Sequence, residues 1–181
     1  MTCLWSRCFC GVLIAFLVAG CGPMLIESDP ATFRVPPKAA AHLRGQQSIA
    51  LKNAYEKETL VMILSRSVGV GWQGDLRQYT ETAITLLSGE MTGKAIDLSP
   101  QAAKSVTLRV RDVRADFIPI ILVYRYECFL VLEAQYGDGT KSIIKAENDS
   151  PVDAPRVVSG AIMRAVERLL GDENFLAYVN R

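Results

Sequence analysis

The chain has 181 residues, half of them hydrophobic, and carries 20 basic against 19 acidic residues. This length fits one domain with a sizeable core, and the near-zero net charge gives no electrostatic reason to expect nucleic-acid binding. The single histidine, His42, precedes the region that we predict to be folded, which excludes a histidine-based catalytic triad in the domain.

Residues 1–20 predict a secretory signal peptide. They hold one cation, Arg7, and no acid, and an apolar run over residues 12–19 leads to Gly20 and Cys21. This pattern is typical of an exported protein, and the run is too short for a membrane span, which takes about 20 apolar residues. Residues 17–21, Leu-Val-Ala-Gly-Cys, resemble a bacterial lipobox. The resemblance implies cleavage between Gly20 and Cys21, diacylglycerol on the Cys21 thiol, and usually a further acyl chain on the new amino group. An ordinary signal peptide and an uncleaved anchor helix are the alternatives.

The cysteines limit the chemistry of the mature chain. Three of the five lie within residues 1–20, and Cys21 would be lipidated, so Cys128 has no partner for an internal disulfide. Its neighbours Tyr126, Phe129 and Leu130 favour a small buried hydrophobe over a reactive thiol. A zinc site of the His/Cys type also lacks ligands. We therefore predict no metal and no cofactor.

Residues 21–46 predict a flexible tether, and residues 47–181 a single folded domain. The tether holds Pro23, Pro30, Pro36 and Pro37 and few large apolar residues. Two apolar segments follow, an alternating one at residues 48–55 and a continuous one at residues 59–64. They predict two strands, which we expect to form a hairpin.

Residues 65–74 predict a loop, and residues 75–88 a helix. Glycines 69, 71 and 74 have the G-x-G-x-x-G spacing, but the strand–helix context of a dinucleotide site is missing, so a bulged connection is favoured. Asp75 and Gln78 have the spacing of a capping box, and Gly89 is placed to end the helix. A connector then runs over residues 91–100.

Residues 105–146 predict an antiparallel meander. Residues 105–112 alternate, residues 117–123 predict a turn, and residues 124–136 form a long strand that leads through a Gly-Asp-Gly turn to a strand at residues 140–146. Asp153 and Asp172 are predicted to cap a last main helix and a short terminal one. The expected fold class is α+β: a two-layer sandwich in which two main helices cover an antiparallel, or mixed, sheet of about five strands.

Three arginines are candidate partner-binding residues. Arg109, Arg111 and Arg125 lie on the polar faces of adjacent predicted strands, where they are candidates for contacting phosphates of lipid or lipopolysaccharide; a solvated sheet face is the alternative. Aromatic residues Tyr124, Tyr126 and Tyr136 share one strand face; such a line is usually part of the core, and any exposed part would be a partner or lipid surface.

Two carboxylates provide the alternative of an enzyme. Asp112 and Asp116 are separated by four positions, and a paired-acid hydrolase is conceivable, against the simpler interpretation of a solvated strand end. Residues 137–139 and 147–149 supply too few oxygen ligands at loop spacing to predict a calcium site.

The order of these features resembles the small envelope lipoproteins of the YajG type, and is similar to transporter-auxiliary and lipopolysaccharide-assembly lipoproteins. The shared layout is a lipidated cysteine, a proline-bearing tether, an early helix, a V-x-L-x-V strand, a longer strand ending near G-x-G, and a final helix closed by Gly-Asp. Here these are Cys21, residues 75–88, 105–112 and 124–139, and the pair Gly171 and Asp172.

The resemblance implies a domain without catalytic residues, held at a membrane and facing the periplasm. Gly22, rather than Asp, follows the lipidated cysteine, which implies the outer membrane. We therefore expect a lipid-anchored envelope protein that acts as a binding, assembly or transport-accessory module and is not an enzyme. Its expected partners are the membrane and another envelope protein or lipid, with no nucleic acid. A hydrolase of envelope glycans and a structural linker between membrane and cell wall are the alternatives.

Overall fold

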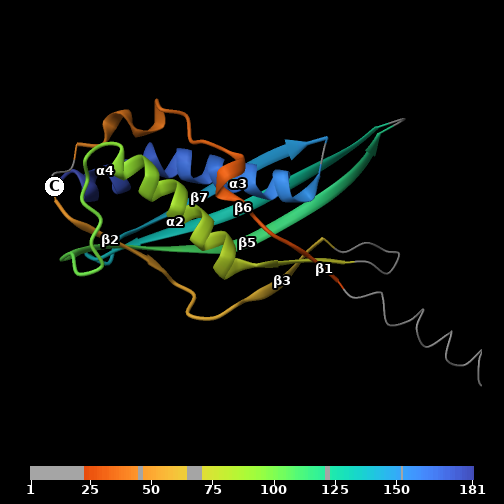
Figure 1. Ribbon diagram of the computed structural model, residues 1–181, viewed down its shortest axis with the longest axis horizontal. Coiled ribbons are helices and arrows are strands. Elements are labelled where there is room, and N and C mark those ends of the chain that lie inside the picture. The colour runs from red at the N-terminus through yellow and green to blue at the C-terminus, as the bar shows by residue number, and fades with distance from the viewer. Residues whose placement is uncertain (1–22, 45–46, 65–70, 121–122, 152) are drawn as a thin grey trace, which may run out of the picture.

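The computed structural model of the protein describes residues 23–44, 47–64, 71–120, 123–151 and 153–181, which form two sheets flanked by helices (Figure 1). The small sheet has the strand order β1–β4–β3, and the large sheet has the order β2–β5–β6–β7. The strands are β1 (Met24–Ile26), β2 (Ile49–Asn53), β3 (Leu60–Leu64), β4 (Trp72–Asp75), β5 (Lys104–Ile120), β6 (Val123–Tyr136) and β7 (Lys141–Ser150). The helices are α2 (Leu76–Thr92), α3 (Ala154–Leu170) and α4 (Glu173–Val179), with short 3-10 turns η1 (Pro30–Thr32) and η2 (Ala39–His42).

The predicted fold class is confirmed, because helices α2 and α3 cover one face of the large sheet and the core lies between the two layers (Figure 1). Strands β5, β6 and β7 form the predicted antiparallel meander, whereas β2 joins β5 in parallel, so the sheet is mixed. Side chains alternate between the two faces of a strand, which places Val106, Leu108 and Val110 of β5 on the face that the helices cover. They pair there with Tyr136, Ala134 and Leu132 of β6.

The β5–β6 hairpin is longer than the sequence predicts. Tyr126 pairs with Ser150 near the end of β7, and beyond it Ile118 pairs with Arg125 and Pro119 with Tyr124. The predicted turn over residues 117–123 is therefore too long: the chain reverses within this range, but β5 continues to Ile120 and β6 begins at Val123. Pro119 is compatible with this strand because β2 pairs with β5 only as far as Leu108. Beyond Leu108, β5 pairs with β6 alone among the described strands, so its other edge is free of backbone pairing.

The predicted hairpin between residues 48–55 and 59–64 is wrong. These segments become β2 and β3, which belong to different sheets, because β3 pairs antiparallel with β4 and β2 pairs with β5. Strand β4 lies inside the predicted loop; four residues with a glycine carry too little periodicity to predict a strand. Gly74 is required by packing, since a Cβ atom there would lie 2.3 Å from the Tyr79 hydroxyl.

The helix ends are mostly as predicted. Asp153 and Asp172 cap α3 and α4 by accepting hydrogen bonds from the backbone N–H groups of Arg156 and Phe175. Asp75 caps α2, but through Arg77 N–H and without the predicted capping box. Helix α2 runs past Gly89 to Thr92, because Met91 extends its buried stripe by one more turn.

Residues 23–44 are not a tether, which corrects the predicted boundary at residue 46. Strand β1 pairs in parallel with β4, and the side chains of Ile26, Val35, Ala40 and Leu43 are buried in the core. Single apolar residues spread along a proline-containing segment have no period, so the sequence pattern gave no sign of their burial. The folded part of the chain therefore extends back to the first described residues.

Two hydrogen bonds hold the start of this segment on α2. The Tyr79 hydroxyl donates to the carbonyl oxygen of Ile26 at 2.6 Å, and the hydroxyls of Ser28 and Thr82 lie 2.7 Å apart. Among the described residues, no helix combines the length and hydropathy needed to cross a membrane.

Candidate functional site

An aromatic column links the small sheet to the projecting end of the β5–β6 hairpin. Ring centroids lie 5.3 Å apart for Trp72 and Tyr126, 5.3 Å for Tyr126 and Phe117, and 5.8 Å for Phe117 and Tyr124. Trp72 is buried at one end of the column, whereas Tyr124 is 47% exposed at the other. The predicted line of tyrosines is thus divided: Tyr136 is core, and Tyr124 is a surface residue.

A second apolar surface lies on the small sheet. Six large hydrophobic side chains are exposed among the described residues, and four of them belong to β1 and β3: Met24, Leu25, Leu60 and Met62, at 43–52% exposure. Leu25, Leu60 and Met62 share one face of the small sheet, and we call these three residues the β1/β3 patch; Met24 lies one position before Leu25 and therefore points to the other face. The sequence does not predict this patch, because residues 24–26 fall in the predicted tether and the continuous apolar run at residues 59–64 does not show which side chains are exposed. The useful signal was the apolar triplet of residues 24–26 close behind Cys21.

The patch is contiguous because of the strand register. Leu25 and Met62 flank Gln73 in one row across the sheet, and Leu60 lies two residues before Met62 on the same face. Gly71 leaves the room that Met62 occupies, since a Cβ atom at residue 71 would lie 2.6 Å from the Met62 sulfur.

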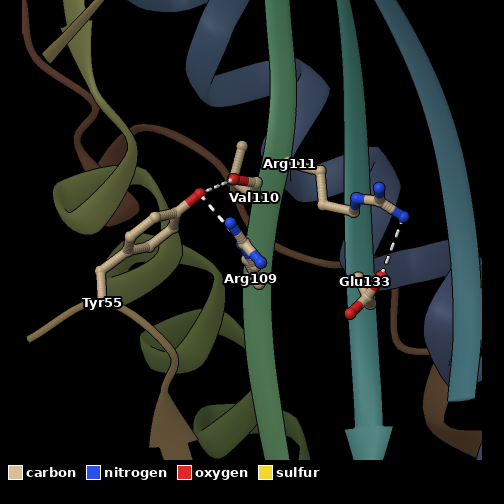
Figure 2. A network of polar contacts seen from close by, with 5 residues as sticks. All are labelled: Tyr55, Arg109, Val110, Arg111 and Glu133. Carbon is tan, nitrogen blue, oxygen red and sulfur yellow. Dashed lines mark hydrogen bonds and ion pairs between the residues drawn. The ribbon is translucent and has the colours of Figure 1, made fainter. Parts of the chain in front are cut away.

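The three candidate arginines do not form one site. Arg109 and Arg125 are separated by eight pairing steps, or roughly 26 Å of strand. Figure 2 shows Arg109 and Arg111 reaching in different directions. Arg109 donates to the Tyr55 hydroxyl at 3.3 Å, a bond that raises the pKa of its guanidinium, and Arg111 pairs with Glu133 at 3.0 Å.

Arg125 has two carboxylate neighbours. Its guanidinium forms an ion pair with Glu127, and Asp149 lies 4.0 Å away. Because acids already balance the charge of Arg111 and of Arg125, these side chains are weak candidates for binding phosphate. The geometry corresponds to the alternative of a solvated sheet face with local ion pairs.

The candidate acids are also apart. Asp112 and Asp116 are four residues apart on β5, so their Cα atoms are separated by roughly 13 Å. Paired glycosidase carboxylates lie about 5–9.5 Å apart, so these two do not reach one bond of a glycan together. The Asp112 carboxylate forms an ion pair with Arg114 at 3.1 Å, and the Asp116 side chain is exposed.

Neither the buried cysteine nor the described acids provide a nucleophile or a metal site. Cys128 is buried as predicted, and this burial raises the pKa of its thiol to about 12, the opposite of an activated nucleophile. Within the described ranges, no group of three or more His, Cys, Asp or Glu residues is arranged to hold a metal ion.

Two open cavities lie on the surface. One of about 430 Å³ is lined by charges of both signs and brings together the candidate residues Asp116 and Arg125, with Glu127 and Arg164 beside them. The other, of about 540 Å³, lies between residues 30–37 and α2 and is mostly apolar, with Phe33 and Leu86 in its walls.

The domain is therefore an α+β domain with two exposed apolar surfaces, at the hairpin end and on the small sheet. No protein-family model and no curated protein matches the chain. Solved structures similar to it include a Xanthomonas campestris protein of the DUF330 family, with 11% identity, a TM-score of 0.44, and coverage of 87% of this chain and 93% of that one. Another is a minor lipoprotein from Acinetobacter baumannii, with 12% identity, a TM-score of 0.36, and coverage of 74% and 90%. At these identities and TM-scores, neither likeness assigns a function to the chain.

Proposed function

We propose that the protein is a lipid-anchored lipoprotein of the bacterial outer membrane that faces the periplasm and acts as a binding, assembly or transport-accessory module. Leu17 to Cys21 supply the lipobox, and acylation of Cys21 provides the anchor. Gly22, rather than Asp, in the position after Cys21 supports the outer membrane. These residues and the cleavage site at Gly20 and Cys21 lie outside the described part of the structure.

The observation that carries the proposal is the position of β1. Its first residue, Met24, comes three residues after Cys21, and a fully extended chain spans at most about 3.6 Å per residue. The backbone of Met24 therefore lies within about 11 Å of the backbone of Cys21, whose sulfur carries the lipid. Because residues 23–44 are packed in the domain, the protein works at the membrane surface and not at the end of a long tether.

The partner contact is assigned to the end of the β5–β6 hairpin. It projects beyond β7 in Figure 1, and Tyr124 is exposed there. The outer edge of β7 is a poorer site for an added strand, because Arg164 and Arg168 donate to the carbonyl oxygens of Glu147 and Lys145. Aromatic side chains on a projecting hairpin fit a protein partner, which we take to be another envelope protein.

The anchor is tested with Cys21→Ala. The expected result is an uncleaved or soluble form in fractionated cells. If Cys21→Ala stays membrane-bound and is processed at the same site, the anchor proposal is wrong.

The partner surface is tested with a photo-crosslinking amino acid at position 124, followed by mass spectrometry of the adducts. Gln135 is the matched control, since it is exposed on the same strand near its other end. We expect a specific envelope protein from position 124 and none from position 135. Equal adducts from the two positions, or none from position 124, would contradict this surface.

The alternatives have less support. The hydrolase requires carboxylates that converge, and Asp112 and Asp116 do not. A linker between membrane and cell wall predicts that the protein binds isolated cell wall, which a sedimentation assay measures directly.

A further inference from the structure

The β1/β3 patch has an unusual composition for an exposed sheet. The small sheet comprises twelve residues in three strands, and Asp75 is the one charged residue among them. Its carboxylate accepts hydrogen bonds from the backbone N–H groups of Thr59 and Arg77, so it caps α2. Within these three strands, the face that carries Leu25, Met62 and Leu60 therefore has no charged side chain other than this cap.

The patch also lies at the start of the described chain. Leu25 follows Cys21 by four residues, so its backbone lies within about 14 Å of the backbone of Cys21. Strand β1 cannot move away from the rest of the patch, because it pairs with β4 along its length and the Tyr79 hydroxyl holds Ile26. Whatever Cys21 is attached to is consequently a permanent neighbour of the patch.

We propose that the β1/β3 patch rests on the lipid bilayer, with Leu25, Leu60 and Met62 in the interface between headgroups and acyl chains. This inference rests on the proposed acylation of Cys21. The bilayer is the occupant because the short connection keeps it next to the patch at high effective concentration, whereas a second copy or a protein partner has no such fixed connection to the patch. Leucine and methionine side chains suit the apolar part of such an interface, and the exposed Glu27 and Glu58 next to the patch can stay at its polar rim.

This contact gives the anchor a second role. Acyl chains alone leave a domain free to rotate about its N-terminus, whereas an apolar sheet face seated on the bilayer fixes one orientation. The β5–β6 hairpin, which packs on the small sheet through Trp72 and Tyr126, is then presented in a constant direction. Cys21 then sets the tethering, and the small sheet beside it sets the orientation.

The test uses the full acylated protein in vesicles of phosphatidylethanolamine and phosphatidylglycerol. An environment-sensitive nitrobenzoxadiazole dye is attached to Met62→Cys, or to Leu25→Cys as an independent second position. Ile143→Cys is the matched control, since Ile143 is 53% exposed on β7, outside the patch. The native Cys128 is buried and the Cys21 thiol is acylated, so neither competes for the dye.

Vesicle flotation is measured first, because protein that does not float reports failure of the anchor and not of the patch. In floating protein we expect emission at positions 62 and 25 to shift to shorter wavelength and to be quenched by lipids with a nitroxide near the headgroup. Emission at position 143 should stay water-like and unquenched. If positions 62 and 25 match position 143 in floating protein, the inference is overturned. It is also overturned if the shift at position 62 persists in detergent and nitroxide lipids do not quench it, which would indicate a protein-covered patch.

Discussion

Two glycine-to-alanine substitutions should change stability in opposite directions. Gly74 lies on β4, where a Cβ atom would be 2.3 Å from the hydroxyl oxygen and 2.6 Å from a ring carbon of Tyr79. Gly89 lies inside α2, where nothing comes within 4 Å of an added Cβ atom. The same chemical change therefore meets a buried ring in one place and open space in the other.

The expected magnitudes follow from these contacts. Tyr79 is fully buried, and its ring must move to admit the methyl group, which costs about 1–3 kcal/mol as overpacking. The movement also breaks the 2.6 Å hydrogen bond to Ile26, which leaves a buried carbonyl without its partner at a cost of about 1–3 kcal/mol. Gly74→Ala should thus lower the free energy of unfolding by about 2–6 kcal/mol. Gly89→Ala should raise it by about 0.5–1 kcal/mol, since alanine is the better helix former.

Urea unfolding measures both effects, with the fluorescence of Trp72 as the probe; the other tryptophan lies within residues 1–20. Hydrogen exchange adds a local readout, because Gly74→Ala should also expose the amides of β1. The close packing of Gly74 against Tyr79 would be refuted by a Gly74→Ala protein as stable as the wild type. A destabilised Gly89→Ala protein would contradict the open space described at that position.

Three further predictions concern single groups. Asp172→Ala should cost about 0.5–2 kcal/mol in thermal unfolding, because the carboxylate caps α4 through the Phe175 N–H group; an unchanged melting temperature would argue against the cap. Arg111→Ala should lower the free energy of unfolding by less than about 1 kcal/mol, because the Arg111 side chain that pairs with Glu133 is half exposed to solvent. A larger loss would mean that this ion pair is needed for the fold. The pKa of the Cys128 thiol is about 12 in the folded protein against an ordinary 9.0, so the thiol of the unfolded chain loses its proton at lower pH. Because the folded state holds this proton longer, the free energy of unfolding should decline as the pH rises from about 9 to about 12. Urea titrations across this range should give a shallower decline for Cys128→Ala, and an identical slope would contradict the buried neutral thiol.

The sequence predicted well those elements that have a long period and a clear end. The meander follows from alternation over many residues, and α3 and α4 follow from apolar stripes that begin at Asp153 and Asp172. In each case local patterns agree with the tertiary fold, so no further information was needed.

The predictions were wrong where contacts between distant parts of the chain determine which strands pair and where a helix ends. Strand β1 has three residues and exists because β4 lies beside it, and the parallel pairing of β2 with β5 joins residues more than 50 positions apart. Helix α2 continues past Gly89 because the side chain of Met91 is buried in the core. Such contacts leave no short-range pattern.

The candidate site was predicted only in part. Arginines 109, 111 and 125 share a sheet face but not a location, since distance along a strand separates them and local partners hold them. The β1/β3 patch was not predicted, because the exposure of Met62 depends on which face of the small sheet is covered. An apolar run in the sequence does not contain that information.

The central claim is that an acylated cysteine lies directly before the first strand of the fold. Intact-mass and N-terminal peptide mass spectrometry of the mature protein tests it most directly. We expect a mature chain that begins at Cys21 and carries the mass of diacylglycerol with a further acyl group. A mature chain that begins at another residue, or an unmodified Cys21, would contradict it.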